Sequence, residues 1–576
     1  MTLLSLGAYS QAAEAYERAL QVNPQQARWW GNLGAARLSK GDFLQAANAF
    51  QQALSFDQAN AAYGNHLGVA LRALGKLEHS ITVLQNALAV SPNHPEAISN
   101  MCIALQQTCQ WDKLAPLLQR LHNSTHHALQ SQVQPAEQPM FNIWRSCDLG
   151  LNSAVARAWS QQSEQQALRG SRRYSHRRPE STNRRITLAY LSYDFRNHPV
   201  AHQLQPLFEL HDRSRFRVLA YSLCADDGSI FHRKIKNDSD EFIEIGHLSP
   251  AKAAGLIHED GTDILIDLMG HSHHNRIQIP ALRPAPIQIG YLGFLATTGA
   301  NFIDYLIADE VVVPPDHYEM YSEKLLQMPF CYQMNHRQFF PTNCTKVRQQ
   351  WGLPSEGVVF CSFNSAYKIS AELFAAWVDI LKQVPGSVLW LLRDNALSER
   401  QLQQAADRLG LETGRLIFAD KVPLIDHVQR LQLADLALDT IAYNGGATTA
   451  NALWAGVPVL TILGNHWVSR MSASHLTALR MPELVAGSLD GYIRRAVNLG
   501  RSSGSLQALR LKLNRRRLVS PLFDGSHFVR DLEAGFEMIW KRYCSGMPPA
   551  HIQVPKRSTG EPKECHYNDK NETIKI

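Results

Sequence analysis

The chain has 576 residues, of which 45% are hydrophobic and 19% charged, and its formal net charge is only +6. This composition is typical of a globular protein with several domains and gives no reason to expect a nucleic-acid partner. The nine cysteines are scattered singly without a CxxC pair, which favours a reducing compartment over a disulfide framework or a zinc site. Neither a signal-peptide pattern nor an apolar run of membrane-spanning length occurs, so we expect a cytoplasmic protein without a membrane partner.

Internal repetition marks residues 1–128. A spacing of 34 residues relates three glycines and three alanines: Gly7, Gly41 and Gly75, and Ala19, Ala53 and Ala87. Such a period, with small residues where two helices cross, resembles the tetratricopeptide repeat. We expect complete units at 27–60 and 61–94, preceded by a unit entered halfway and followed by a degraded unit from 95 to about 128. Arrays of this kind bind proteins or peptides on a concave surface, and a mere spacer is the alternative.

Residues 129–185 connect the array to the rest of the chain. Helical patterns up to about Gln166 are followed by a basic stretch, RGSRRYSHRRPESTNRR, from Arg169 to Arg185. Tyr174 is its one aromatic residue, so we interpret the stretch as a solvated linker and keep a nucleic-acid-binding arm as the alternative.

From Ile186 onwards, short apolar strands alternate with helical segments, which predicts parallel sheets covered on both faces. The first series of strands is expected at 186–192, 216–223, 242–244, 264–268, 287–290 and 305–308. The second is expected at 358–363, 387–392, 416–418, 436–438 and 457–462. We therefore predict two Rossmann-like domains, 186–340 and 341–527, with a ligand cleft between them and a join near 339–350. A last helix (528–543) and a polar tail with little to bury complete the segment 528–576.

The stretch ADLALDTIAYNGGATTANALWAGVPVLTI, from Ala434 to Ile462, reads as strand, loop, helix and strand. The helix is expected to begin at Thr448 and Thr449 and to end near Gly456. Helix starts offer unpaired N–H groups and a positive dipole end, which suit a diphosphate. Threonine is also a good N-cap, so an ordinary capped helix is the alternative.

Polar residues follow several other strands, at the edge where open α/β sheets bind ligands. His198 can serve as a general base or as a hydrogen-bond donor to a phosphate, or can pack structurally before Pro199. The small-residue loop 290–299 can approach a ligand closely or form a turn. Lys368 can neutralise a phosphate, although lysines at helix starts are more often solvated. His427 and Arg430 lie three residues apart on one helix face.

Long local motifs connect these loops to a known family. They are RPAPIQ at 283–288, YSEKL at 321–325, VPGSVLWLLR at 384–393 and LWAGVPVLT at 453–461. With the repeats, this ordered set resembles the O-linked N-acetylglucosamine and SPINDLY-type transferases of glycosyltransferase family 41. The resemblance covers nearly the whole chain. It implies an α + α/β protein, in which a tetratricopeptide α-solenoid precedes a glycosyltransferase of type GT-B.

The resemblance also implies a reaction and a site. The reaction is inverting transfer of N-acetylglucosamine from UDP-N-acetylglucosamine to Ser or Thr hydroxyls, without a metal or other cofactor. His198 matches the active-site histidine at the acceptor face, and Lys368 matches the lysine that stabilises the leaving diphosphate. The implied donor-binding residues are Thr297, Ser365, Tyr367, Lys368, Val422, Pro423, Leu424, His427, Val428, Gln429, Arg430, Gly446, Ala447, Thr448, Thr449 and Asn451.

Some positions depart from the family pattern. Asn451 stands in place of an aspartate that binds the ribose, Gly446 and Ala447 replace larger residues, and Ala296 adds a methyl group beside the donor sugar. Two alternatives follow: a SPINDLY-like O-fucosyltransferase that uses GDP-fucose, and a repeat scaffold whose transferase half has decayed.

Overall fold

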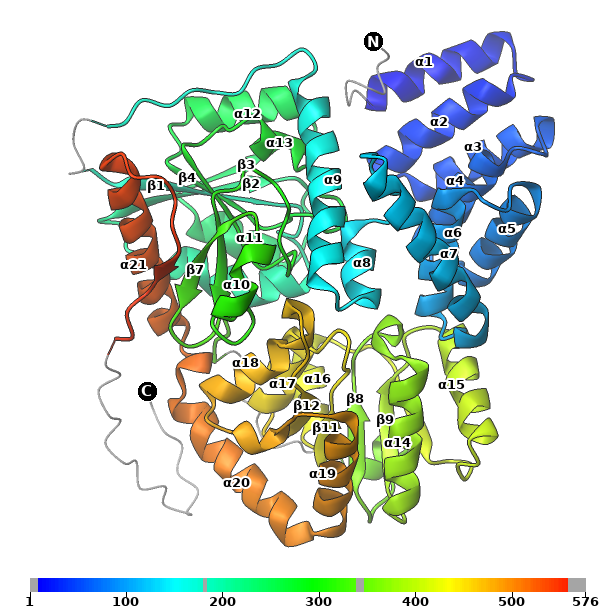
Figure 1. The fold of residues 1–576 in the computed structure, drawn as a ribbon, viewed down its shortest axis with the longest axis vertical. Coiled ribbons are helices and arrows are strands. Elements are labelled where there is room, and N and C mark those ends of the chain that lie inside the picture. The colour runs from blue at the N-terminus through cyan, green and yellow to red at the C-terminus, as the bar shows by residue number, and fades with distance from the viewer. Residues whose placement is uncertain (1–8, 180–183, 338–346, 558–576) are drawn as a thin grey trace.

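The computed structural model describes residues 9–179, 184–337 and 347–557. Figure 1 shows a helical array beside two α/β domains, with helices α8 and α9 between the array and the first domain. No helix in these described ranges is both long and apolar enough to cross a bilayer. Gly7, most of the expected join at 339–350 and the end of the polar tail lie outside the described residues.

Within the described residues, seven helices form the array. They are α1 (Tyr9–Val22), α2 (Ala27–Lys40), α3 (Phe43–Phe56), α4 (Ala61–Ala73), α5 (Leu77–Val90), α6 (Pro95–Gln107) and α7 (Trp111–Gln130). The pairs α2–α3 and α4–α5 occupy the two complete units expected from the sequence. The 34-residue period recurs in the backbone, because Gly41, Gly75 and Cys109 all have a positive φ, at 85°, 72° and 55°. Small residues let the helices approach: a Cβ atom on Gly34 would lie 2.8 Å from the Phe50 ring.

The connecting helices are α8 (Pro139–Arg145) and α9 (Leu149–Leu168). The basic stretch after them is not a solvated linker throughout, which corrects the expectation. The amide of Tyr174 donates to the carbonyl of Leu282 at 2.9 Å, and the Tyr174 ring stacks on His258 at 4.4 Å. Arg184 makes two hydrogen bonds of 2.6 Å to the carboxylate of Asp263. These contacts attach the stretch to the first α/β domain.

The first sheet has eight parallel strands in the order β14-β7-β6-β5-β4-β1-β2-β3. Their bounds are β1 Ile186–Ser192, β2 Phe216–Ser222, β3 Glu241–Glu244, β4 Ile264–Asp267, β5 Ile287–Gly290, β6 Tyr305–Asp309, β7 Lys324–Met328 and β14 Ile552–Gln553. The helices are α10 Pro199–Leu210, α11 Ile230–Asp238, α12 Pro250–Glu259 and α13 Gln278–Ala281. Strands β7 and β14 were not expected. The tail was expected to bury little, yet it supplies β14 and the buried Val554.

The second sheet has six parallel strands in the order β10-β9-β8-β11-β12-β13. Their bounds are β8 Val359–Ser362, β9 Val388–Leu392, β10 Leu416–Ala419, β11 Leu436–Leu438, β12 Val459–Ile462 and β13 Val485–Ala486. The helices are α14 Ala371–Gln383, α15 Ala396–Arg408, α16 Leu424–Leu431, α17 Ala447–Trp454, α18 Met471–Ala478, α19 Leu489–Arg501 and α20 Ser503–Val519. The parallel sheets expected from the alternating pattern are confirmed.

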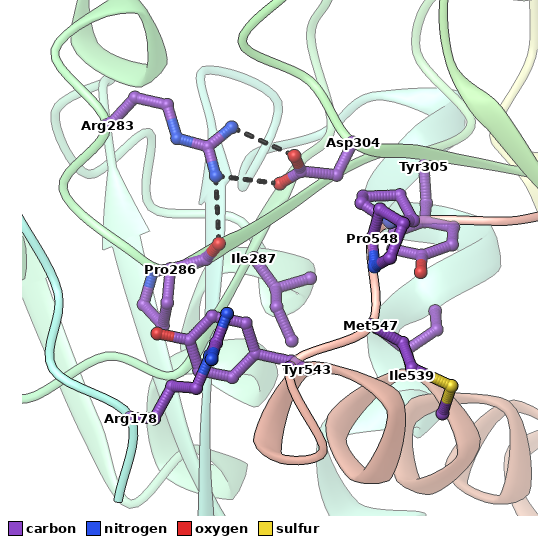
Figure 2. A pocket seen from close by; sticks show the side chains of 12 residues that line it. Arg178, Arg283, Pro286, Ile287, Asp304, Tyr305, Ile539, Tyr543, Met547 and Pro548 are labelled. Carbon is purple, nitrogen blue, oxygen red and sulfur yellow. Dashed lines mark hydrogen bonds and ion pairs between the residues drawn. The ribbon is translucent and has the colours of Figure 1, made fainter.

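The last helix, α21 (Gly525–Cys544), returns to the first domain (Figure 1). Its buried Glu533 accepts hydrogen bonds from the amide of Asp212 at 2.8 Å and pairs with His211 Nδ1 at 2.9 Å. A cavity of about 320 Å³ lies between this helix and strands β5 and β6 (Figure 2). Arg283, from the RPAPIQ motif, lines it and binds both carboxylate oxygens of Asp304, at 3.0 and 3.1 Å. This motif arginine is therefore structural.

The loop 290–299 packs closely against other backbone segments of the protein. Gly299 has a φ of +65°, and a Cβ atom there would fall onto the backbone nitrogen of Arg157 in α9. A Cβ on Gly293 would fall onto the carbonyl of Leu268. These two glycines therefore allow the loop to pack against the backbone of Leu268 and of α9.

Gly299→Ala is expected to lower the free energy of unfolding by about 1–3 kcal/mol, because the added methyl group overpacks the contact with α9. Gly261→Ala is the matched control, since Gly261 has a φ of +68° but nothing within 4 Å of its Cβ position. Urea-unfolding midpoints of both variants measure the difference. Equal losses in the two variants would show that backbone strain, not the contact with α9, decides the effect.

Candidate active site

Two neighbouring strands of the second sheet bring their loops together around Lys368. Strands β8 and β11 are parallel and adjacent, so their carboxyl ends lie at one edge. The Lys368 Nζ atom, at the end of the β8 loop, donates to the carbonyl of Asn444 in the β11 loop at 2.8 Å. It also lies 4.2 Å from the centre of the Tyr443 ring. Burial lowers the pKa of Lys368 to about 8, while the charge of Asp439 acts in the opposite direction.

The start of helix α17 lies at the same edge. The helix begins at Ala447, with Gly446 as a cap residue that contributes no side chain. The helix thus starts one residue before the predicted position, and neither threonine caps it, so the capped-helix alternative is wrong. Thr448 Oγ1 instead donates to Asn364 Oδ1 at 2.9 Å, and Thr449 Oγ1 lies 2.8 Å from Ser472 Oγ. These hydroxyls fasten the helix start to the β8 loop and to α18.

Asp439 fixes the loop that precedes α17. Its Oδ1 atom accepts from the amide of Gly445 at 2.8 Å, and its Oδ2 atom accepts from Thr461 Oγ1 at 2.8 Å. The carboxylate is buried, which raises its pKa despite these donors. Its negative charge lies close enough to Lys368 to favour the ammonium form.

Helix α16 carries His427 and Arg430 as one unit. Arg430 Nε donates to His427 Nδ1 at 3.2 Å, as expected for residues on one helix face. The Arg430 side chain is only 1% exposed, and its guanidinium lies 4.8 Å from the Phe363 ring centre and 5.2 Å from that of Trp351. Because Nδ1 accepts, the His427 proton is on Nε2, and burial lowers the pKa of this ring to about 3. Arg430 thus lies in the interior and holds a neutral His427 in place.

The other predicted donor-binding residues of the second α/β domain lie around the carboxyl edge of its sheet. Ser365 and Tyr367 belong to the β8 loop, next to Lys368, and both are half-buried. Val422 and Pro423 lead into α16, whose first residue is the half-buried Leu424. The other predicted donor-site positions on these helices are Val428, which is buried, and Gln429 and Asn451, which are half-buried.

His198 and Thr297 lie in the first α/β domain. His198 precedes α10, and its Nδ1 atom lies 3.3 Å from the donating amide of Val200 and 3.4 Å from Asp194 Oδ2. Burial lowers the pKa of His198 to about 4, so the ring is neutral at pH 7. Thr297 Oγ1 donates to the buried Glu323 at 2.6 Å, so the proton of this hydroxyl is already engaged in a hydrogen bond within the first domain. Glu323 belongs to the YSEKL motif, to which sequence reasoning gave no role.

The two domains meet beside the α17 start. Ser474 Oγ, in α18, donates to Asp309 Oδ2, at the end of β6, at 2.6 Å. A Cβ atom on Gly446 would lie 3.3 Å from Gln333 Oε1 of the first domain. Small residues at this position therefore keep a first-domain side chain close to the helix start.

The last repeat contacts the Lys368 loop directly, which sequence reasoning missed. Gln106 Nε2 donates to the carbonyl of Tyr367 at 2.7 Å, and Trp111 Nε1 donates to that of Ile369 at 3.1 Å. From α8, the Trp144 ring stacks on Tyr367 with a centroid distance of 4.1 Å. Nothing in the repeat period signals these contacts.

The architecture is that of a GT-B glycosyltransferase preceded by tetratricopeptide repeats: a helical array, two parallel-sheet domains and a lysine beside a helix start at one sheet edge. The sequence profile of Glycosyl transferase family 41 matches residues 108–348 and 342–532, and that of the Tetratricopeptide repeat matches residues 3–70. The chain belongs to glycosyltransferase family 41.

Several known proteins are similar to this chain. A probable UDP-N-acetylglucosamine–peptide N-acetylglucosaminyltransferase SEC of Arabidopsis thaliana is 34% identical over 462 residues, which cover 78% of this chain and 47% of that protein. The corresponding Caenorhabditis elegans enzyme is 31% identical, covering 64% of this chain and 42% of its own length. The chain thus spans about half the length of these curated relatives. A mutant of the Thermobaculum terrenum O-GlcNAc transferase superposes with a TM-score of 0.70 at 28% identity, covering 94% of this chain and 98% of that one.

Proposed function

We propose that this protein is an inverting O-glycosyltransferase that transfers N-acetylglucosamine from UDP-N-acetylglucosamine to Ser or Thr hydroxyls of proteins. The observation that carries the proposal is the Lys368 ammonium, held between the β8 and β11 loops beside the start of α17. The names of these relatives, UDP-N-acetylglucosamine–peptide N-acetylglucosaminyltransferases, support the same donor and acceptor classes. Tetratricopeptide repeats support proteins as partners, bound along the array.

In this proposal the second domain holds the nucleotide sugar. Negative charge grows on the diphosphate as the bond between sugar and phosphate breaks, and a positioned ammonium stabilises that charge. Lys368 and the amides at the start of α17 supply this stabilisation, so we assign no step to a metal ion. Val422, Pro423 and Leu424 would face the base, Asn451 the ribose, and Gly446 to Thr449 the diphosphate.

The acceptor approaches from the first domain in this scheme. The Nδ1 atom of the neutral His198 ring accepts from the amide of Val200, so Nε2 carries the proton and would donate a hydrogen bond to the acceptor hydroxyl oxygen, which orients that hydroxyl for attack. Attack from the face opposite the nucleotide inverts the configuration of the sugar carbon. We also propose a cytoplasmic location, in keeping with the free thiols of the described cysteines.

A donor panel tests the proposal. Purified protein is incubated with UDP-N-acetylglucosamine, UDP-glucose, UDP-galactose and GDP-fucose, and both donor hydrolysis and transfer to Ser/Thr peptides are measured. We expect turnover with UDP-N-acetylglucosamine. Turnover with GDP-fucose alone would select the fucosyl alternative, and neither turnover nor nucleotide binding would select the scaffold.

Activity is expected to fall as the pH rises through about 8, because the pKa of Lys368 is lowered to about 8 and the neutral amine cannot stabilise the diphosphate. Below that pH the ammonium is protonated and active. A bound diphosphate favours the ammonium, so the alkaline limb of kcat should lie at higher pH than that of kcat/KM. Rate profiles from pH 6 to 10 measure both limbs. The residual activity of Lys368→Arg should show no alkaline fall of kcat or kcat/KM, since a guanidinium stays protonated. An alkaline fall that persists in this variant would assign the titration to another group.

A further inference from the structure

Three potential metal ligands lie together where strand β2 ends. Asp226 and Asp227 belong to the loop after β2, and His232 lies in the first turn of α11. One ligand atom from each residue lies within 4.8 Å of the other two. His232 Nε2 is 3.8 Å from Asp226 Oδ1, which is too long for a hydrogen bond. Two ligands of one zinc ion, each about 2.0–2.2 Å from it, lie roughly 3–4 Å apart.

The orientation of His232 points to a missing ligand. Its side chain is completely buried, and its Nδ1 atom lies 2.8 Å from the carbonyl oxygen of Phe195. A carbonyl only accepts, so Nδ1 carries a proton, and an unprotonated Nε2 would present its lone pair to an ion. This Nε2 atom is buried without a hydrogen-bond partner, which costs free energy. Metal-binding histidines are commonly oriented in this way, with the other ring nitrogen donating to a carbonyl.

The two carboxylates are held by backbone amides and keep lone pairs for an ion. Asp226 Oδ1 accepts from Gly228 N at 2.8 Å, and the Asp226 side chain is 49% exposed. Asp227 accepts from Ser229 N at 3.0 Å and from Asn197 N at 2.7 Å. Arg233 also reaches the loop, donating to the carbonyl of Gly228 at 2.9 Å, so the cluster has an excess of one negative charge.

We propose that Asp226, Asp227 and His232 bind one divalent transition-metal ion, with water completing its coordination. One imidazole nitrogen and two carboxylates suit Zn²⁺, and also Mn²⁺, Fe²⁺ or Co²⁺. The site is joined to the loop that carries His198 at two points, the carbonyl of Phe195 and the amide of Asn197. The ion therefore fixes the loop that carries His198, the histidine proposed to face the acceptor hydroxyl, and takes no part in bond breaking. The proposal does not depend on the identity of the donor sugar.

Zinc titration of the chelator-treated full chain by calorimetry tests the site. We expect one strong site, and Asp226→Asn should weaken it at least about tenfold, the lower end of the loss seen for disturbed metal sites. His232→Asn should do the same, because its amide replaces Nδ1–H toward Phe195 but offers no nitrogen at the Nε2 position. Asp226 is half-exposed, so Asp226→Asn is expected to fold normally.

Two controls separate this site from others. Asp212→Asn removes another exposed carboxylate that accepts a backbone amide, that of Ser214 at 2.9 Å. His126→Gln breaks the surface pair His122–His126 on α7, whose ring centres lie 4.3 Å apart. Both controls should leave the strong site unchanged. Zinc binding that survives Asp226→Asn and His232→Asn, or that is lost in His126→Gln, would overturn the proposal.

Amide hydrogen exchange gives a readout that does not need enzymatic activity. Zinc should slow exchange at Asn197, Gly228 and Ser229, because their amides donate to the two ligating carboxylates. The protection should disappear in Asp226→Asn. Equal exchange with and without zinc in the unmutated chain would contradict the coupling between the ion and the His198 loop.

Discussion

Replacing Lys368 with alanine is expected to lower kcat for glycosyl transfer by about 100- to 1,000-fold, the range for the loss of one positioned charge-stabilising group. The ammonium is fixed by the carbonyl of Asn444 and the face of Tyr443, so it needs no reorganisation during the reaction. Donor affinity should fall less than kcat, because charge on the diphosphate grows in the transition state. Initial rates with a Ser/Thr peptide and the donor identified by the panel measure both effects.

Two variants make this result specific. Lys421→Ala removes an exposed lysine that pairs with Asp394 at 2.9 Å, and its kcat should equal that of the unmutated protein. Lys368→Arg keeps a positive charge in a wider, planar group and should be intermediate. The melting temperature should be similar for Lys368→Ala, Lys368→Arg and Lys421→Ala, since Lys368 ends a short 3-10 turn outside the sheet and its covering α-helices. Full activity of Lys368→Ala would remove this residue from the reaction.

The parts of the structure with a regular period were predictable. A spacing of 34 residues located the helix pairs of the array because each unit repeats the same crossing, down to the left-handed backbone at Gly41 and Gly75. Buried parallel strands appear as short apolar runs, and most observed strands agree with the expected ranges to within two residues. Strand β14 was missed because a two-residue edge strand carries no period.

Side-chain partners in the site were less predictable than its position. Sequence reasoning selected Arg430 as a donor-site residue, but three aromatic rings from distant elements enclose its guanidinium. Thr297 bonds to Glu323, which lies 26 residues further along the chain. Tyr443, whose ring faces the Lys368 ammonium, lies in the stretch from Ala434 to Ile462, and the sequence pattern there assigns it no role. Such pairings depend on tertiary packing, which a single sequence does not specify.

The docked repeat gives the array a structural role beside the proposed recognition of acceptor proteins. Residues of α6, α7 and α8 contact the backbone or rings of residues 366–369, so the segment that carries Lys368 is supported from outside its own domain. If an acceptor protein binds along the array, the array that holds it also contacts the proposed diphosphate site directly. This contact predicts that mutations in the connecting helices change catalysis without touching either substrate.

Trp144→Ala is expected to show this most clearly. The Trp144 ring stacks on Tyr367 at 4.1 Å and meets Phe141 edge-on at 5.9 Å, so alanine removes the stacking partner of the Tyr367 ring. We expect a loss of about 3 kcal/mol in unfolding free energy, the lower end for removing a packed tryptophan. We also expect kcat to fall by about tenfold or more, because small displacements of a catalytic group cost up to about 100-fold. Urea unfolding and initial rates measure the two effects.

A double-mutant cycle distinguishes positioning of Lys368 from general damage. If Trp144 acts through Lys368, adding Trp144→Ala to Lys368→Ala should lower kcat by less than about twofold further, because the supported group is already gone. Independent effects would instead multiply. Trp144→Phe should restore much of the activity by keeping an aromatic face against Tyr367. Trp30→Ala, in α2, where the indole donates to the carbonyl of Pro24 at 2.7 Å, should leave kcat unchanged and serves as the control.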